Sequence, residues 1–339
     1  MDNRIPVTLL TGFLGSGKTT LLNKLLPQSG MKDTAVIINE LGTTGLDHIF
    51  AQHVESSYVA DNTVLLQNGC LCCTLSNELA DTMRDLFFKR ALQAIPEFKR
   101  LIIETTGLAD PGPILGSLMN EPVIESVYRL DAVVVTVDSV YGADQIAQHF
   151  EARKQAAVAD VLLITKADLA TPQQLADLKE TLITLNPSAT QHKILQGEIE
   201  ADYLVDVGLF DAATLRPEPQ RWLRAPVKPS SGLQKNKHGN IHDKAISSFT
   251  VMLPQPMQWA TFKPVLLKFC QTYGKDLLRL KGILHVTDQP DPLAIHAVHF
   301  TPYPPTLLED YAEDEPQSRI VVIGLGLNEA EIRRFLTTF

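Results

Sequence analysis

The chain has 339 residues, of which 45% are hydrophobic and 20% charged, and it carries a formal net charge of −9. This length leaves room for two domains, or one large one, around a substantial core. The acidic balance argues against a general nucleic-acid or anionic-membrane binder, and no apolar run approaches the length of a membrane span. Four cysteines without a preceding secretory signal predict a reducing, cytoplasmic compartment, where thiols serve metal or catalytic roles.

The first predicted strand, residues 5–11, runs into a match to the phosphate-binding pattern GxxxxGKS/T at residues 12–19. Leucines at helical spacing follow in residues 20–26, so the motif lies between a strand and a helix. Backbone N–H groups at the glycines would face phosphate oxygens, Lys18 would reach the β- and γ-phosphates, and the Thr19 hydroxyl would bind Mg²⁺. The predicted nucleotide-binding residues here are Gly12, Gly15, Ser16, Gly17, Lys18, Thr19 and Thr20. The alternative is a glycine-rich turn without a ligand.

Two further strands are predicted at residues 34–39 and 63–66, and the second leads into a cysteine cluster. Cys70, Cys72 and Cys73 fall within four residues. Thiolates so close together repel one another unless a cation neutralises their charge, and a soft metal ion does this best. A structural zinc site normally draws four ligands from two separated pairs. The cluster therefore predicts transient binding of Zn²⁺, Co²⁺ or Ni²⁺, with the open position left for Glu40, a histidine, water or a client protein. Small-residue packing in a turn and a redox thiol set are the alternatives.

A helix is predicted over residues 75–94, followed by an apolar strand at residues 100–104 that ends on Glu104. A carboxylate at this place in a nucleotide-binding sheet normally holds Mg²⁺ through water. Gly107 would let the backbone approach the γ-phosphate, which makes residues 108–113 a candidate nucleotide sensor. The alternative is an exposed carboxylate followed by an ordinary turn.

Strands are also predicted at residues 132–138 and 161–165, and the second ends in Thr165-Lys166-Ala167-Asp168. Asp168 could accept two hydrogen bonds from the guanine edge, which adenine does not offer. Lys166 would lay its aliphatic stem along the base. Thr165 stands where asparagine is usual in this motif. We therefore expect GTP rather than ATP.

The alternation of apolar strands with helices predicts a doubly wound α/β fold of the P-loop NTPase kind, with a mostly parallel sheet and the ligand at the carboxyl ends of the strands. We expect this domain to occupy residues 1–212. A proline-rich and basic linker or mobile loop should follow at residues 213–245, holding His238 and His242. Two histidines form a poor metal-binding tract, so a solvated loop is favoured over a metal role.

A smaller α+β domain is predicted for residues 246–339, as a sheet with helices on one side that contacts a partner or client. Its predicted strands are 247–253, 277–286, 293–300 and 319–325, and its predicted helices are 257–273 and 329–339. His285, His296 and His299 lie on these predicted strands and are interpreted as packed or half-exposed rather than metal-ligating. Cys270 lies in an apolar helical stretch and is interpreted as core.

Together these motifs resemble the CobW-type GTPases of the zinc-metallochaperone kind, which are related to UreG and HypB and have a SIMIBI-like fold. The resemblance rests on the following segments: 10–20, 39–42, 69–73, 104–111 and 165–168, with a weaker likeness at 278–284. It implies slow GTP hydrolysis coupled to transfer of Zn²⁺ or another divalent transition metal to a client metalloprotein. It also implies catalytic roles for Lys18, Glu40 and Glu104. Leu41 and Thr43 depart from the family's Asn-Glu-Phe-Gly-Glu segment, so only Glu40 is carried over.

Such coupling would make metal affinity differ between the GTP and GDP states, because the γ-phosphate and Mg²⁺ would order the Glu40 and Gly107 loops. No glutamine or arginine near Gly107 in the sequence is an obvious catalytic group, so slow intrinsic turnover is expected. The alternatives are a P-loop small-molecule kinase or ATPase and a nucleotide-gated scaffold with structural zinc. The sequence leaves open the client, the physiological metal, the water-activating group and the oligomeric state, with a homo-oligomer among the alternatives.

Overall fold

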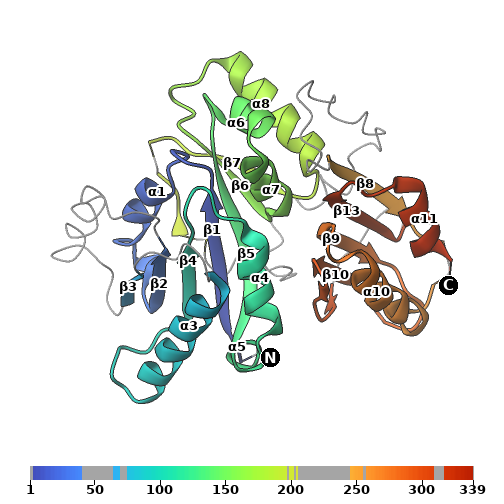
Figure 1. The fold of residues 1–339 in the computed structure, drawn as a ribbon, viewed down its shortest axis with the longest axis horizontal. Coiled ribbons are helices and arrows are strands. Elements are labelled where there is room, and N and C mark those ends of the chain that lie inside the picture. The colour runs from blue at the N-terminus through green and yellow to red at the C-terminus, as the bar shows by residue number, and fades with distance from the viewer. Residues whose placement is uncertain are drawn as a thin grey trace. The chain divides into compact units, whose positions relative to one another are not determined.

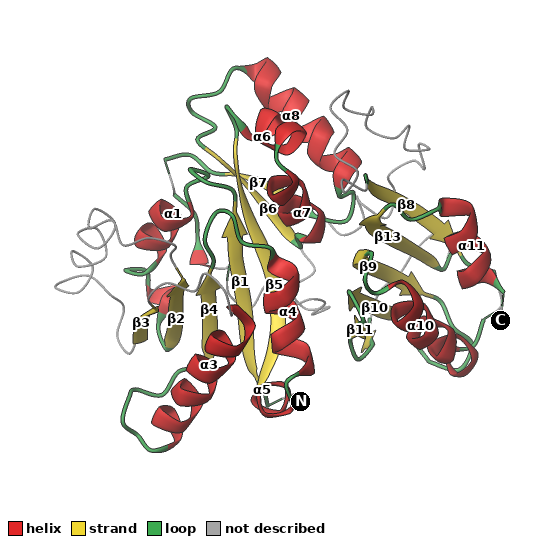
Figure 2. Ribbon diagram, in the orientation of Figure 1, coloured by secondary structure: helices red, strands yellow, loops and turns green. Residues whose placement is uncertain are grey.

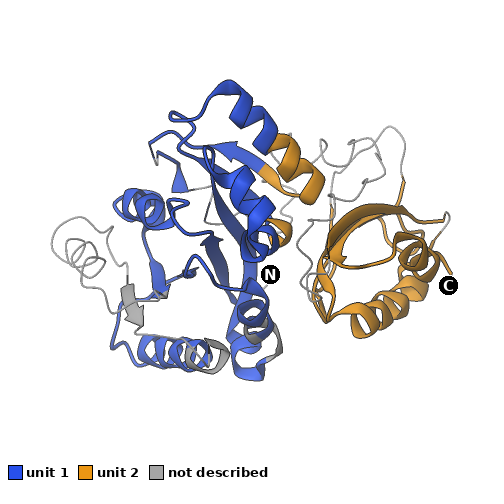
Figure 3. Cartoon of the chain, turned by 45° about the horizontal axis from the view of Figure 1, so that its top comes forward, with its two compact units in different colours: residues 1–155, 159–178, 191–209 blue, residues 156–158, 179–190, 210–339 orange. Residues whose placement is uncertain are grey.

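The computed structural model describes residues 3–39, 64–68, 75–196, 198–201, 204, 245–254, 257–308 and 317–338. Two compact units divide the chain (Figure 3). Unit 1 comprises residues 1–155, 159–178 and 191–209, and unit 2 comprises residues 156–158, 179–190 and 210–339. Apart from Ala245, the predicted linker at 213–245 lies outside the described residues, as do His238 and His242.

Unit 1 contains a seven-stranded sheet with the order β3-β2-β4-β1-β5-β6-β7 (Figure 1). The strands are β1 Ile5–Gly12, β2 Thr34–Asn39, β3 Val64–Asn68, β4 Arg100–Glu104, β5 Tyr128–Asp138, β6 Val161–Thr165 and β7 Thr190–Lys193. Neighbouring strands from β3 to β6 are parallel. The continuous apolar runs predicted such a sheet, since strands covered on both faces need apolar residues at every position.

The described helices that lie wholly or partly in unit 1 are α1 Lys18–Leu25, α3 Leu75–Ala91, α4 Pro111–Asn120, α5 Pro122–Val127, α6 Gly142–Gln148, α7 Phe150–Val158 and α8 Pro172–Leu185, with a 3-10 turn at Ser29–Met31 (Figure 2). The last residues of α7 and α8 belong to unit 2. Leucines of α1 pack with Leu10 of β1 and Val134 of β5 in one buried cluster. The alternate strand positions Leu9 and Val133 are also fully buried, and α4 and α5 both contact β5. The sheet therefore has helices on both faces, as a doubly wound fold requires.

Several element boundaries differ from the predictions, and two of these differences have a clear physical reason. The strand predicted at residues 132–138 begins four residues earlier, at Tyr128, because Asp131 is 1% exposed within it and interrupts the apolar pattern. The helix predicted to end at residue 94 ends at Ala91, and Gln93 adopts a left-handed backbone with φ of 55°. Its exposed apolar neighbour Leu92 extended the helical pattern beyond the real end.

Unit 2 holds an antiparallel sheet with the order β11-β10-β9-β13-β8, and β12 also pairs with β10. The strands are β8 Ile246–Met252, β9 Leu277–Leu284, β10 Leu293–Val298, β11 Thr301–Pro302, β12 Thr306–Leu307 and β13 Arg319–Leu325; the helices are α10 Trp259–Tyr273 and α11 Glu329–Thr337. Residues of both helices form a core with alternate residues of the sheet, such as Val322 and Ile295. The predicted α+β architecture is confirmed.

Cys270 lies in the core, where the sequence interpretation put it, whereas only His296 of the three histidines lies within a strand, because β9 ends before His285 and β10 ends before His299. Cys270 is fully buried, and burial raises the pKa of its thiol to about 12. A thiol that stays protonated is a poor metal ligand. His296 is 2% exposed, whereas His285 and His299 are half-buried. Within the described ranges, no helix is long and apolar enough to cross a membrane.

Helix α10 depends on a carboxylate from outside it, because Gln258 at its N-cap makes no side-chain hydrogen bond to it. Asp288 accepts hydrogen bonds from the backbone N–H groups of Ala260 and Trp259, at 3.0 and 2.7 Å. These two bonds lower the pKa of Asp288 below its ordinary value. The stabilisation they give is present above the unfolded pKa of about 3.9 and is lost as the pH falls through the lower folded pKa.

We therefore expect Asp288→Ala to lower the melting temperature at pH 7, and this difference from wild type to shrink below about pH 4. Thermal unfolding followed by circular dichroism from pH 3 to pH 7 measures it. A difference that stays constant over this range would show that the ionised carboxylate does not cap α10.

Candidate functional site

The loop between β1 and α1 has the backbone shape that its glycines predict. Gly12, Gly15 and Gly17 have φ values of 143°, 71° and 93°, which L side chains rarely adopt. A Cβ at Gly12 would also lie 2.5 Å from the carbonyl oxygen of Thr136. Gly17 is the N-cap of α1, so the loop leads directly into the helix N-terminus. This strand–loop–helix geometry suits phosphate, because backbone N–H groups and the helix dipole converge on one place.

Neighbouring strands hold this loop by hydrogen bonds. The Ser16 hydroxyl, fully buried, lies 2.7 Å from the Thr136 hydroxyl at the end of β5. The Thr165 hydroxyl, at the end of β6, lies 2.8 Å from the Ser16 carbonyl oxygen and 3.2 Å from that of Val137. Thr165 therefore connects β6 to the loop, although it replaces the asparagine that is usual in its motif.

Two charged side chains lie at the start of α1 and the end of β4. The Lys18 ammonium donates to the carbonyl oxygens of Gly12 and Phe13 at 2.8 and 3.4 Å, so it bridges the loop. The Thr19 hydroxyl donates to Oε1 of Glu104 at 3.0 Å. Glu104 is 2% exposed and in register with Leu10 of β1, which brings its carboxylate beside α1. The next residue on α1, Thr20, is exposed.

The Thr19–Glu104 pair suits Mg²⁺. A hydroxyl and a carboxylate are hard oxygen donors of the kind that this ion prefers, usually with several waters retained. The strand-end carboxylate expected from the sequence thus lies within hydrogen-bond distance of the loop's threonine, although 85 residues separate the two.

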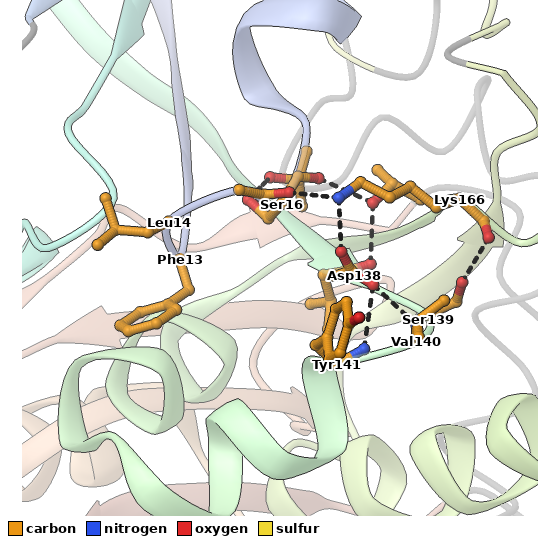
Figure 4. Close-up of polar contacts among 12 residues, drawn as sticks. Phe13, Leu14, Ser16, Asp138, Ser139, Val140, Tyr141 and Lys166 are labelled. Atoms are coloured by element: carbon orange, nitrogen blue, oxygen red, sulfur yellow. Dashed lines mark hydrogen bonds and ion pairs between the residues drawn. The ribbon is translucent and has the colours of Figure 1, made fainter. Parts of the chain in front are cut away.

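Lys166, in the segment after β6, contacts the phosphate-binding loop and forms an ion pair with Asp138 (Figure 4). Lys166 has a φ of 54°, and its ammonium donates to the Gly15 carbonyl oxygen at 2.7 Å and to Oδ2 of Asp138 at 2.6 Å. Asp138 is 2% exposed, and its other oxygen accepts the backbone N–H groups of Val140 and Tyr141. Asp168 is exposed. Lys166 therefore lies over the loop, next to the edge where a base would be read.

The loop after Glu104 lies against the phosphate-binding loop on one side and α7 on the other. A Cβ at Gly107 would lie 2.7 Å from the backbone nitrogen of Leu14. The Gln155 carboxamide of α7 donates to the carbonyl oxygens of Gly107 and Ala109 at 3.2 and 3.0 Å. Gly107 is thus where two loops meet, which only a residue without a side chain permits.

The sequence interpretation missed Asp138 and Gln155. Asp138 ends an apolar strand as Glu104 does, and the same argument about strand ends could have found it. Gln155 lies 48 residues from Gly107 in the sequence, in a helix of ordinary composition, so no local pattern indicates its contact with the loop. The sequence shows no glutamine near Gly107, whereas folding brings the Gln155 carboxamide to within 3.2 Å of the Gly107 carbonyl oxygen.

The predicted metal residues Glu40, Cys70, Cys72 and Cys73 lie outside the described residues. In the part of the chain that the structure describes, no group of three or more His, Cys, Asp or Glu side chains could hold a metal ion. The strands that lead to the predicted metal residues are described. β2 and β3 end as register partners, Asn39 beside Asn68, and Ile38 of β2 is also in register with Glu104.

The fold and the loop geometry define a P-loop nucleotide-binding protein. Comparisons with known proteins identify the family to which it belongs. The family model for the CobW/HypB/UreG nucleotide-binding domain matches residues 6–193, and that for the cobalamin synthesis protein CobW C-terminal domain matches residues 246–339. The chain belongs to the CobW/HypB/UreG family.

Several characterised relatives span nearly the whole chain. The zinc chaperone YjiA of Escherichia coli is 33% identical over 336 residues, covering 98% of this chain and 97% of YjiA. The zinc chaperone CobW of Pseudomonas aeruginosa is 30% identical, covering 99% of this chain and 91% of CobW. The crystal structure of Zn(II)-bound YjiA GTPase from E. coli superposes with a TM-score of 0.70 at 29% identity, covering 98% of each chain.

Gly107→Ala should lower nucleotide affinity about tenfold, which is about 1.4 kcal/mol, because the added methyl group displaces either its own loop or the backbone of Leu14. Fluorescence titration with a labelled guanine nucleotide measures the change. Gly116→Ala is the matched control, since a Cβ at this position in α4 meets no atom within 4 Å. Equal affinities in both variants would contradict the close approach.

Thr165→Val should destabilise the protein by about 1–2 kcal/mol, because the buried carbonyl oxygens of Ser16 and Val137 lose their hydroxyl donor. Thr165→Ser keeps the hydroxyl and should retain most of the stability. Thermal unfolding with and without nucleotide measures both variants. If valine and serine behave alike, the hydroxyl does not hold the loop.

Proposed function

We propose that this chain is a GTP-hydrolysing metallochaperone that carries Zn²⁺ and couples nucleotide hydrolysis to metal transfer to a client metalloprotein. The chain is a GTPase of the CobW/HypB/UreG family that uses GTP, Mg²⁺ and Zn²⁺. Relatives that span nearly its whole length are named zinc chaperones, and another, from Schizosaccharomyces pombe, is named a zinc-regulated GTPase metalloprotein activator. Zinc binding at the cysteine cluster and transfer of the metal to a client are the parts that we propose beyond the family membership.

The phosphate-binding part of the proposal rests on the β1–α1 loop. Gly12, Gly15, Ser16, Gly17 and Thr20 would line the phosphates, with Lys18 as their cation. The Lys18 ammonium now bonds to carbonyl oxygens inside the loop, so it already lies where phosphate oxygens would replace those partners. Charge neutralisation of this kind lowers the barrier to phosphoryl transfer.

Thr19 and Glu104 would hold Mg²⁺. The hydrogen bond between them shows that a hydroxyl and a carboxylate oxygen share one small space, which is a suitable donor set for this ion. Bound Mg²⁺ would supply positive charge to the β- and γ-phosphate oxygens. Glu40 is the second carboxylate, after Glu104, to which we assign a catalytic role, and it would link the nucleotide to the carried metal.

Guanine selectivity is assigned to the segment after β6. Lys166 lies over Gly15 and is fixed there by Asp138, so its aliphatic stem is in place to cover one face of a base. Asp168 is exposed two residues further on and would accept the guanine N1–H and N2–H₂ groups. Thr165 contributes by holding the same strand end against Ser16.

One observation supports coupling between the nucleotide and the carried metal: the register of β2 and β3. Asn39 and Asn68 are partners at the ends of adjacent parallel strands. Glu40 follows the first directly, and Cys70 follows the second by two residues, so chain connectivity starts both segments at the same end of the sheet as Glu104. Cys72 and Cys73 come next along the chain. Thiolates with one carboxylate would give Zn²⁺ a site that a change in the Glu40 segment can open.

The localisation, turnover and assembly of the protein stay predictions. We expect a cytoplasmic protein with slow intrinsic turnover that a client or metal accelerates. A homo-oligomer is among the assemblies that we consider.

The decisive measurement is a Zn²⁺ competition titration against a chromophoric chelator, with Mg²⁺ and either GDP or a non-hydrolysable GTP analogue. We expect wild-type affinity to differ between the two nucleotides by roughly fivefold or more. Cys72→Ala should weaken binding on the order of 100-fold, because it removes a thiolate ligand.

Cys270→Ala is the matched control, because it removes a buried thiol that is fully protonated at neutral pH. It should leave zinc affinity unchanged. Zinc that binds identically with either nucleotide would favour a structural role, and phosphoryl transfer to a small acceptor in the same preparation would favour a kinase.

A further inference from the structure

The contact between α7 and the loop after β4 has no role in the function proposed so far. Gln155 is 1% exposed and lies near the end of α7. Its Nε2 donates to two carbonyl oxygens of that loop, those of Gly107 and Ala109. A carboxamide is the neutral side chain whose single nitrogen carries two hydrogens, so one Gln155 nitrogen can hold two carbonyl groups at once.

The other atom of this carboxamide is unusual. Gln155 Oε1 is buried and accepts no hydrogen bond from the described residues. Buried polar atoms without a hydrogen bond are uncommon in native proteins, so each one needs an explanation. Turning the carboxamide over would leave Oε1 facing two carbonyl oxygens, so the two donor bonds fix its orientation.

The neighbouring residue on α7 holds the next part of the same loop. The Lys154 ammonium lies 2.5 Å from Oδ2 of Asp110, whose other carboxylate oxygen accepts the Gly112 N–H at the start of α4. Directly after Gln155, in the last turn of α7, the carbonyl oxygens of Ala156 and Ala157 accept hydrogen bonds from the Asn186 side chain. Gln155 is therefore attached to an anchored helix.

These bonds determine which way the loop's amide groups point. In a trans peptide, the carbonyl group and the following N–H point in opposite directions. Because the Gly107 carbonyl faces α7, the N–H of Leu108 faces away from α7. Gly107 also approaches the phosphate-binding loop, since a Cβ on it would lie 2.7 Å from the backbone nitrogen of Leu14. The Leu108 N–H is thus a backbone donor that faces away from α7 and follows the residue nearest to the phosphate-binding loop.

We propose that Gln155 is a positioning residue for GTP hydrolysis: it holds the Gly107–Leu108 peptide with its N–H directed to the terminal phosphate. This inference rests on the proposed GTPase function and adds a residue to it. Gln155 itself does not touch the nucleotide. It acts through the loop, so it affects the step that involves the γ-phosphate and leaves the binding of GDP, which lacks that group, unchanged.

The test uses Gln155→Met, which keeps the length of the side chain without its donors, and Gln155→Glu, which replaces the donor nitrogen by an oxygen. Both should lower kcat for GTP by about tenfold or more, with GDP affinity within about twofold of wild type. Gln148→Glu is the matched control, because it introduces the same charge at an exposed position on α6. It should leave kcat unchanged.

Melting temperatures measured with GDP bound separate this role from a structural one. Unchanged kcat in folded Gln155→Met, or equal losses of kcat and GDP affinity, would overturn the proposal. Absence of GTP hydrolysis in the wild type would instead overturn the proposed function on which it rests.

Discussion

The nucleotide site depends on a set of threonine hydroxyls at the carboxyl ends of adjacent strands. Thr136 and Thr165 hold Ser16 from β5 and β6, while the Thr11 and Thr105 hydroxyls lie 2.7 Å apart across β1 and β4. A β-branched residue favours the strand conformation, and its short hydroxyl satisfies a buried polar group beside it. The same residue type therefore completes the strand and fixes the loop that follows it.

A loop fixed in this way can present backbone groups without reorganising, which is the main requirement for stabilising a transferred phosphoryl group. The loop after β4 is held by other kinds of contact. It is held by side chains of α7 and by its close approach to Leu14. The two loops are thus held by different means: strand-end hydroxyls hold the first, and a helix side chain and a close backbone contact hold the second.

The sequence predicted the parallel sheet, the phosphate-binding loop and the α+β unit because each depends on local pattern: apolar strand runs, glycine spacing and helical periodicity. The sequence-based predictions were wrong where the burial of a residue did not match its polarity. Asp131 lies inside β5 and shortened the predicted strand, whereas exposed Leu92 lengthened a predicted helix. Gln155 could not be assigned from pattern alone, since the Gly107 carbonyl oxygen that it contacts lies 48 residues away in the sequence. Asp138 ends an apolar strand as Glu104 does, but its partner Lys166 lies 28 residues away and only the fold brings it near.

The place of β3 in the strand order has a consequence for how this protein can diversify. β3 stands at one end of the sheet, paired with β2, whereas β1, β4 and β5 occupy the middle and carry the phosphate-binding parts. Substitutions or insertions next to a terminal strand leave the central hydrogen-bond ladder intact. If the segment after β3 binds the metal as proposed, the choice of metal can therefore evolve separately from the choice of nucleotide.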